Sequence, residues 1–346
     1  MHYETFEEVI EGLKKKRRTA HLLLGNGFSM AYDPKIFSYN ALYDFINSLN
    51  DETLSVVFAA VKTKNFEIIM EQLETFIGLL QKLGSDVALQ KKLTAANEKL
   101  KHSLLDAIKA LHPEHVFKIP EDKSIACASF INGFLEPGGK VFTTNYDLLL
   151  YWILMRQNVP NAVDGFGRDL LNPVEVEERT ESEDWSELRW GVNKQKQNVF
   201  YLHGSLPLFD TGAEVVKEQY NDDGYLLENI GARLKNAEYP IFVTAGNCAD
   251  KLSQIRHNRY LSDCYDRLCE LDGSVVTLGF GFGESDDHII EALNKATHYR
   301  TKGAPKIWSV YIGTFSEKDQ QWIASIAGKF HAKVHTFDAK TANIWA

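Results

Sequence analysis

Three short motifs carry the side chains of this sequence that could perform chemistry. Each is an apolar run that ends in small polar residues: residues 21–29 (HLLLGNGFS), 141–147 (VFTTNYD) and 200–205 (FYLHGS). Each pattern predicts a buried strand with polar groups at its carboxyl end. In an open parallel α/β sheet these ends line one ligand crevice. We therefore expect a glycine turn, Asn145 and His203 to meet in one active site.

The first motif could hold a phosphate group. Gly25-Asn26-Gly27 follows the apolar run and precedes a helix start, so its backbone could approach a pyrophosphate closely and direct N–H groups at it. A tight turn without a ligand is the alternative interpretation. Met30 stands where the third glycine of the dinucleotide fingerprint would be.

Asn145 and His203 are the candidates for catalysis. Asn145 lies between a strand and a helix that is expected to begin near Leu148, a place where asparagine also serves as a helix cap. His203 could act as a general base, because an unperturbed imidazole titrates near pH ~6.5. A structural histidine at a strand end is the alternative.

A fourth motif, residues 274–287 (SVVTLGFGFGESDD), predicts a strand that runs into a glycine-rich turn, then acids and a helix. Glycines allow a close approach of the backbone to a ligand, and Ser285 or Asp286 could bind ribose hydroxyls. A turn in which Ser285 or Asp286 only caps the helix is the alternative.

Seven apolar, β-branched runs predict the strands that would position these motifs. They lie at about residues 20–24, 140–144, 198–202, 241–245, 274–279, 307–312 and 333–337, with helical patterns between several of them. Strands that alternate with helices indicate right-handed crossovers and a doubly wound, mostly parallel α/β sheet. The chain is expected to form one domain over residues 1–346.

Two segments interrupt this alternation. Residues 41–116 read as a helical insertion after the first strand, because apolar residues at three- and four-residue spacing predict helices at 41–49, 53–63, 66–83 and 86–111. The insertion could cap the crevice, make oligomer contacts or serve only as structural packing.

Residues 160–197 contain an acidic stretch from Glu175 to Glu187, which is typical of a solvated loop. A mobile lid or a partner-docking segment is the functional interpretation.

The composition argues against several classes of function. The formal net charge of -9 disfavours direct nucleic-acid binding, since phosphate neutralisation needs a basic face. The longest apolar run, residues 148–155, is too short to span a membrane, and the acidic first residues do not resemble a signal peptide. A cytoplasmic protein is therefore expected.

The cysteine and histidine spacings predict no metal site. The four cysteines contain no C-x-x-C pair, so the sequence predicts reduced, mostly buried thiols and no zinc ribbon. His112 and His115 have a metal-like spacing, but a loop with two exposed imidazoles is the favoured interpretation.

Taken in order, these motifs resemble the sirtuin-related family in its bacterial SIR2-like branch. The order is GNGFS (25–29), TTNYD (143–147), LHGS (202–205) and LGFGFGESD (278–286). Lys251 and Ile255 also resemble the K-x-x-x-I region of that branch. The resemblance implies a Rossmann-like NAD site. Sirtuins that deacylate proteins carry two C-x-x-C pairs around a structural zinc, and this chain has neither those pairs nor the sirtuin G-I-P-D-F-R stretch.

The resemblance implies a role for each site residue. Asn145 and His203 would flank the nicotinamide ribose as the catalytic residues. The residues implied to bind NAD+ are Gly25, Asn26, Gly27 and Ser29 at the pyrophosphate and its ribose, Thr144 and Asp147 at the Asn145 turn, Gly279, Ser285 and Asp286 at the adenosine end, and Asp33, the acid that stands in place of the sirtuin stretch.

The resemblance, with Asn145 and His203 retained and the zinc-binding cysteine pairs missing, implies hydrolysis of NAD+ at the nicotinamide–ribose bond, with NAD+ as the substrate and no cofactor. Asn145 would position the water or the ribose hydroxyls, and His203 would accept a proton as water adds at C1′. The resemblance implies an NAD-depleting effector of antiphage defence, kept silent by homo-oligomer assembly or by a partner sensor or activator protein encoded nearby. The alternatives are a non-catalytic NAD or ADP-ribose sensor and an ADP-ribosyl transferase or cyclase. Lysine deacylation is disfavoured by the missing cysteine pairs.

Overall fold

The computed structural model describes residues 3–34, 51–61, 66–84, 86–113, 115–168, 187–219, 225–236, 238–243, 247–297 and 307–346. Seven strands form its main sheet: β1 (Glu4–Thr5), β2 (Ala20–Leu24), β3 (Val141–Thr143), β6 (Val199–Tyr201), β10 (Gly273–Leu278), β11 (Ile307–Thr314) and β12 (Lys333–Asp338). Every neighbouring pair in this sheet is parallel. The predicted α/β fold with a mostly parallel sheet is therefore confirmed.

The strand order of this sheet reverses at β2. The order is β1-β12-β11-β10-β2-β3-β6. Without the edge strand β1, and numbered along the chain, the strands lie in the spatial sequence 3-2-1-4-5-6, which is the order of dinucleotide-binding sheets. Leu24, at the end of β2, lies beside Thr143 on one side and Leu278 on the other. In such sheets ligands bind outside the carboxyl ends of the strands at this reversal.

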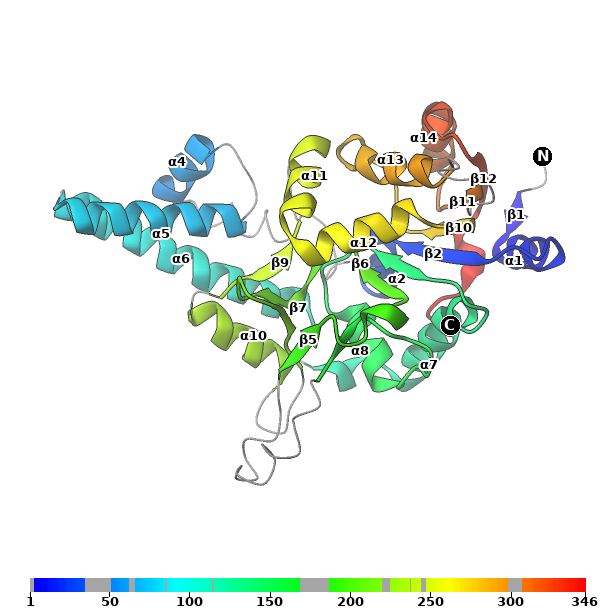
Figure 1. Ribbon diagram of the computed structural model, residues 1–346, viewed down its shortest axis with the longest axis horizontal. Coiled ribbons are helices and arrows are strands. Elements are labelled where there is room, and N and C mark those ends of the chain that lie inside the picture. Colours follow the sequence, from blue (N-terminus) through cyan, green and yellow to red (C-terminus); the bar gives the residue numbers. More distant parts are fainter. Residues whose placement is uncertain are drawn as a thin grey trace, which may run out of the picture.

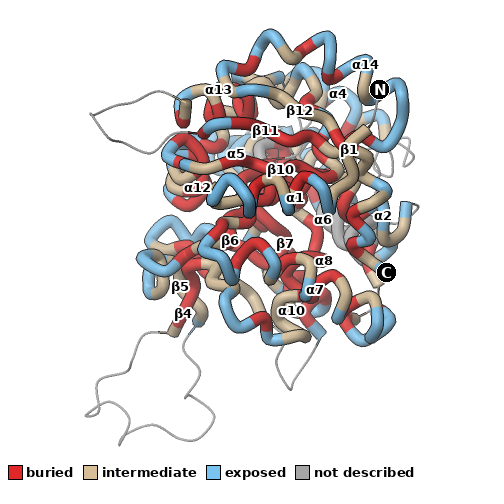
Figure 2. Tube along the Cα trace, turned by 90° about the vertical axis from the view of Figure 1, so that its right-hand side faces the viewer, coloured by how far each residue is buried: buried red, intermediate tan, exposed pale blue. Residues whose placement is uncertain are grey.

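Helices cover both faces of the sheet, and Figure 2 shows the strands as a buried layer between partly exposed helices. The helices around the sheet are α1 (Phe6–Lys15), α2 (Asn26–Tyr32), α7 (Glu121–Leu135), α8 (Leu149–Arg156), α11 (Cys248–His257), α12 (Arg259–Cys269), α13 (Asp287–Ala296) and α14 (Glu317–Ile326). Helix α7 contacts β2 and β3 and packs on α8, whereas α12 contacts β6 and packs on α11 and α13. Short 3-10 turns include η1 (Val116–Lys118), before α7, and η3 (Glu284–Asp286), before α13.

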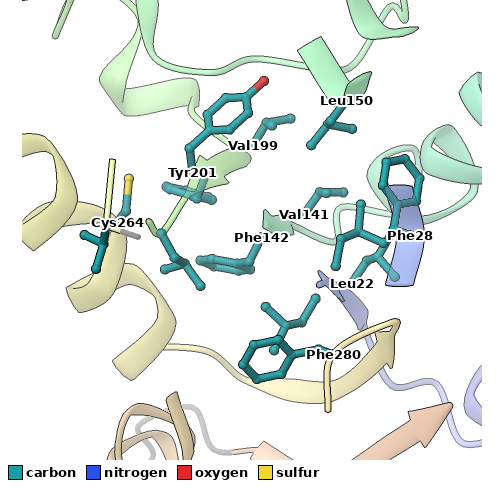
Figure 3. Packing of buried hydrophobic residues seen from close by; sticks show 14 of the residues in the cluster. Leu22, Phe28, Val141, Phe142, Leu150, Val199, Tyr201, Cys264 and Phe280 are labelled. Carbon is teal, nitrogen blue, oxygen red and sulfur yellow. The ribbon is translucent and has the colours of Figure 1, made fainter. Parts of the chain in front are cut away.

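Alternation along the strands sends apolar side chains to the two faces. Leu22, Val141 and Val199 are neighbours in the strand register and are fully buried, and Leu150 of α8 lies on their side of the sheet (Figure 3). Phe142 and Phe200 point to the other face, where their rings stack with centroids 4.7 Å apart. Both faces of these strands are therefore apolar and buried, which is typical of a parallel sheet covered by helices on both sides.

A second sheet differs from the prediction. It is antiparallel, with the order β4-β5-β8-β7-β9, and consists of β4 (Phe166–Gly167), β5 (Leu188–Trp190), β7 (Gly204–Asp210), β8 (Val215–Lys217) and β9 (Pro240–Phe242). The run predicted at 241–245 as a strand of the main sheet therefore lies in this one, where β9 pairs with β7 from Gly204 onward. Gly204 has a φ of +75°, which lets the chain leave β6 and enter β7 directly.

The segment 160–197, predicted as a solvated loop or lid, contributes strands to the second sheet. Its described ends form β4 and β5, which pair with each other. Residues 169–186, which include most of the acidic stretch, lie outside the described residues. The short helix α10 (Leu226–Lys235) packs against β7 of this sheet.

The predicted insertion contains α4 (Glu52–Val61), α5 (Phe66–Leu83) and α6 (Val87–Leu111). Helices α5 and α6 run side by side and extend away from the parallel sheet as an arm (Figure 1). The base of this arm contacts α10 through α6. The helix predicted at 41–49 lies outside the described residues.

In the part of the chain that the structure describes, no helix is both long and apolar enough to cross a lipid bilayer. The four cysteines are free thiols, and three of them are buried, as the sequence predicts.

Candidate functional site

The carboxyl ends of four strands meet at one edge of the parallel sheet. The N–H of Thr144 donates to the carbonyl of Leu24 at 3.0 Å, and the N–H of Leu202 donates to the carbonyl of Thr143 at 2.8 Å. On the other side of β2, the N–H of Gly25 donates to the carbonyl of Leu278 at 3.0 Å. These bonds continue the ladder past the strand ends, so the four predicted motifs lie next to one another.

The glycine turn after β2 packs against the backbone of the turn after β10. The N–H of Gly27 donates to the carbonyl of Gly279 at 2.8 Å, and a Cβ on Gly27 would lie 2.6 Å from Cα of Gly279. A Cβ on Gly25 would lie 2.6 Å from the carbonyl oxygen of Gly279. The N–H groups of Gly25 and Gly27, which the sequence predicts to point at a pyrophosphate, are therefore used in backbone hydrogen bonds.

Three buried polar residues form what we call the amide cluster: Ser29, Asn145 and Asp147. The Nδ2 of Asn145 donates to Oγ of Ser29 at 2.9 Å, and that hydroxyl donates to Oδ2 of Asp147 at 2.7 Å. Asn145 is not the cap of helix α8, whose N-cap is Leu148. Oδ1 of Asp147 instead accepts the N–H of Leu149 at 2.9 Å. The amide cluster thus fixes the Asn145 side chain through a residue of helix α2, which follows the glycine turn.

Asp147 is electrostatically unusual. Burial raises the pKa of Asp147 above its ordinary value, while the charge of His112 and the hydrogen bond from Ser29 oppose that rise. His112 is itself buried, its Nε2 accepts the N–H of Leu148 at 3.3 Å, and its ring packs edge-on against Trp152. The expectation of an exposed imidazole is therefore wrong for His112. The sequence gives no sign of this contact, because it joins the end of the insertion to the Asn145 turn.

The second group of polar residues is the histidine cluster, made of His203, Lys251, Asp286 and His288. Nε2 of His203 lies 2.9 Å from Nε2 of His288, and the two rings stack with centroids 5.2 Å apart. His203 is 1% exposed and His288 0% exposed. Nδ1 of each ring is buried without a hydrogen-bond partner among the described residues. The sequence prediction does not include His288, although this residue directly follows the fourth motif.

Burial controls the charge of both rings. Burial lowers the pKa of His203 well below its ordinary value, and the charges of His288 and Lys251 lower it further. Burial also lowers the pKa of His288 to about 4, against the opposing charge of Asp286. Both rings are therefore neutral at pH 7. In the hydrogen bond between their Nε2 atoms, one ring donates and the other accepts. His203 can accept a proton at neutral pH, but it is a weaker base than the unperturbed imidazole that the sequence predicts.

Lys251 fixes the turn that leads into α13. Its Nζ is 2.7 Å from Oδ1 of Asp286 and 3.2 Å from Oγ of Ser285, and the lysine is 2% exposed. Asp286 is the N-cap residue of α13 but makes no side-chain cap hydrogen bond, so the capping alternative does not hold for it. The buried Lys251 thus forms an ion pair with Asp286, a contact that the sequence does not predict.

Part of the histidine cluster has the composition of a metal site. Within the described residues, one ligand atom from each of His203, Asp286 and His288 can be chosen so that all lie within 4.8 Å of one another. Two imidazoles and a carboxylate suit zinc or iron. Two contacts compete with such a use, since the Nε2 atoms bind each other and Oδ1 of Asp286 binds the Lys251 ammonium. The described contacts are those of a hydrogen-bonded network.

Ser205, two residues after His203, hydrogen-bonds to the backbone of the turn that carries Asn145 and Asp147. Its Oγ donates to the carbonyls of Tyr146 and Asp147 at 3.3 and 3.4 Å.

Asp33 is a predicted site residue that lies apart from the others, because it follows α2 at the end opposite the glycine turn. Asn26 lies in the first turn of α2, and its Nδ2 donates to Sδ of Met30 at 3.1 Å.

The comparisons with known proteins identify a family but no activity. A family model described as a domain of unknown function, DUF4917, matches residues 22–345. The match begins in β2 and continues past β12, so it includes all the strand ends that form the site. No curated protein matches the sequence.

Proposed function

This chain belongs to the DUF4917 family, a domain of unknown function, and we propose that it is an NAD+ glycohydrolase. The reaction breaks the nicotinamide–ribose bond and yields nicotinamide and ADP-ribose. The observation that carries this proposal is that Asn145 and His203 follow the ends of two paired strands, β3 and β6, in a sheet with the dinucleotide-binding strand order.

The proposed chemistry needs no strong acid, because the leaving group is already cationic. The bond between C1′ and the pyridinium nitrogen breaks, its electron pair leaves with neutral nicotinamide, and C1′ becomes oxocarbenium-like, as in other glycoside cleavages. The oxygen of water then bonds to C1′. His203 accepts the proton that this water loses and later releases it to solvent. NAD+ and water therefore give nicotinamide, ADP-ribose and one proton.

The amide cluster supports a positioning role for Asn145. The hydroxyl of Ser29 donates a hydrogen bond to Asp147, and its oxygen accepts the hydrogen bond from Nδ2 of Asn145. The other end of the amide, Oδ1, is then oriented as an acceptor for a ribose hydroxyl or the attacking water. A side chain held in one orientation before the substrate binds lowers the entropic cost of reaching the transition state.

The burial of His203 supports a regulated enzyme. Its ring is 1% exposed, and Nε2 is bound to His288, so NAD+ can reach the ring only if neighbouring segments move. We propose that assembly of several copies or binding of an activator protein causes this movement, and that the enzyme depletes NAD+ in antiphage defence. A protein that is fully active as an isolated monomer would contradict the regulated part of the proposal.

The test is release of nicotinamide and ADP-ribose from NAD+ by the purified protein, separated by chromatography. The protein is assayed alone, at high concentration and with the products of neighbouring genes. His203→Ala and Asn145→Ala are expected to abolish release while circular dichroism shows that the fold is retained. The exposed residues His257 and Asn161 give matched controls, His257→Ala and Asn161→Ala, which should keep full activity. Full activity of both site variants would refute the assignment.

One observation favours a second candidate, a protein that binds NAD+ or ADP-ribose without turnover. The engaged and buried His203 would be the resting state of an enzyme, but it would be the permanent state of a sensor. Tight NAD+ binding by calorimetry, with no nicotinamide release under any condition above, would select the sensor. Nicotinamide release without ADP-ribose would instead indicate transfer to another acceptor or cyclisation.

A further inference from the structure

Helix α6 of the insertion ends at a residue that reaches the candidate site. That residue is His112, the C-cap of α6. We propose that His112 is a positioning residue, which holds the Asn145 turn, residues 144–148 between β3 and α8, by accepting the main-chain N–H of Leu148. The consequence for turnover rests on the proposed function. The hydrogen bond and its hold on the turn do not depend on it.

Chemistry fixes the donor and the acceptor of this hydrogen bond. The main-chain nitrogen of Leu148 lies 3.3 Å from Nε2 of His112, and a main-chain N–H can only donate. Nε2 of His112 is therefore unprotonated, and a neutral imidazole then carries its proton on Nδ1. A ring protonated on both nitrogens would have no acceptor for Leu148.

Burial makes this acceptor necessary. Leu148 is 0% exposed and His112 is 7% exposed, and a buried main-chain N–H that loses its acceptor destabilises the fold. The ring of His112 is itself held in place, because it packs edge-on against Trp152 of α8 with ring centroids 6.0 Å apart. His112 is thus a fixed acceptor between the end of α6 and the start of α8.

The N–H of Leu148 lies beside the residue that anchors the amide cluster. Leu148 directly follows Asp147, whose Oδ1 accepts the N–H of Leu149 and whose Oδ2 accepts the hydroxyl of Ser29. That hydroxyl accepts Nδ2–H of Asn145. A shift of the Leu148 backbone would therefore move the Asp147 carboxylate and, through Ser29, change the orientation of the Asn145 amide.

The same contact gives the helical insertion a role at the site. Helix α6 runs along the arm (Figure 1), and its last turn leads directly into His112. The insertion therefore supports the Asn145 turn from outside the parallel sheet. This role differs from capping the crevice, because His112 acts on the backbone of the turn and not on a bound ligand.

Nitrogen NMR of histidine-labelled protein at pH 7 tests the hydrogen bond without any enzymatic assay. The His112 signals are identified by their loss in His112→Gln. The proposal predicts a protonated Nδ1 and an unprotonated Nε2 at His112 in the wild type. A wild-type His112 that carries a proton on Nε2 would overturn the proposal, and this measurement does not depend on the folding of any variant.

The side-chain amide signal of Asn145 tests whether this bond holds the turn. The signal is identified by its loss in Asn145→Ala. His112→Ala should shift or broaden it, whereas His112→Gln, whose amide oxygen can accept the same N–H, should restore the wild-type signal. His115→Ala is the matched control, because the ring of His115 stacks on Tyr225 instead, and it should leave the signal unchanged. An Asn145 signal that is also unchanged in His112→Ala would overturn the proposal.

Kinetics of NAD+ hydrolysis test the consequence for turnover. His112→Ala should lower kcat by about 10- to 100-fold with little change in KM, the range expected when a reacting group is misplaced. His112→Gln should recover most of the loss, and His115→Ala should keep the wild-type kcat. A normal kcat in His112→Ala beside a shifted Asn145 signal would overturn the role in turnover. If the wild type hydrolyses no NAD+, the proposed function fails, and the two NMR measurements still decide whether His112 holds the turn.

Discussion

The N–H of Gly27 donates to the carbonyl of Gly279 at 2.8 Å, and this bond joins the turn after the central strand to the turn after its neighbour. Gly279 has a φ of +67°, and a Cβ there would lie 2.3 Å from the backbone nitrogen of Phe28. Both glycines are thus required by backbone contact. The glycine pattern that resembles a phosphate loop is explained in this structure by two strand ends that touch.

Gly279→Ala is expected to destabilise the protein by about 2–5 kcal/mol. The left-handed conformation costs a residue with a Cβ about 1–2 kcal/mol, and overlap with the Phe28 backbone adds about 1–3 kcal/mol. Denaturant unfolding measures this loss. Gly281→Ala, in the same loop, is the control, because no atom lies within 4 Å of its added Cβ. Equal stability of the two variants would show that the close approach does not constrain the turn.

Ser29→Ala should remove the link between Asn145 and Asp147. The buried carboxylate and amide each lose a partner, which costs about 1–3 kcal/mol, and the Asn145 side chain loses its fixed orientation, so that kcat falls at least about tenfold. Ser205→Ala removes another buried hydroxyl at the same turn, one that binds only the carbonyls of Tyr146 and Asp147 among the contacts described above. We expect Ser205→Ala to lower the unfolding free energy by a similar amount and to retain activity. A Ser29→Ala enzyme with normal kcat would separate the amide cluster from catalysis.

Lys251→Met should lower the free energy of unfolding more than the double variant Lys251→Met/Asp286→Asn does. Removal of one partner from a largely buried ion pair leaves a charge without compensation and costs about 3 kcal/mol, whereas removal of both charges costs less. The unfolding free energies of wild type, both single variants and the double variant form a cycle that gives the coupling energy. Additive effects in that cycle would show that the 2.7 Å contact contributes little to stability.

Stability should fall as the pH decreases from about 6.5 toward 4. In the folded protein the pKa of His203 lies below the ordinary value, and the pKa of His288 is lowered to about 4. The unfolded chain therefore binds more protons than the folded protein in this window. Each such proton changes the unfolding free energy by about 1.4 kcal/mol per pH unit. His288→Gln removes one of these groups and should show a shallower slope in urea unfolding between pH 6 and 4.5. The exposed His257→Gln is the control. Identical slopes for wild type and His288→Gln would contradict the burial of a neutral ring.

The centre of the parallel sheet could be predicted from the sequence because its strands are apolar runs buried on both faces. Leu22, Leu23 and Leu24 are all 0% exposed, and a run of this kind is typical of a parallel strand covered by helices on both faces. The antiparallel sheet could not be predicted in the same way. Its strands β4 and β5 are only two and three residues long, and the contacts that pair them are set by the tertiary structure rather than by a repeating pattern.

The candidate site could be predicted as far as its residues stand at the ends of those strands. Ser29, Asn145 and Asp147 do lie together, because two neighbouring strand ends, those of β2 and β3, bring them to one edge. His288, His112 and the burial of Lys251 could not be predicted. Each depends on where a helix packs, and neither residue spacing nor composition records which side chain a helix turns toward a neighbouring strand.

The central strand β2 can pair with its neighbouring strands only late in the synthesis of the chain. Leu24 pairs with Thr143 and with Leu278, so a ribosome must deliver more of the chain before either edge of β2 is covered. Until then three consecutive leucines and two unpaired backbone edges are open to other molecules, which is the situation in which strands aggregate. Pairings so distant along the chain also close slowly. We therefore expect the yield of native protein during synthesis to depend on chaperones that shield residues 20–24, and to decrease sharply when translation outpaces them.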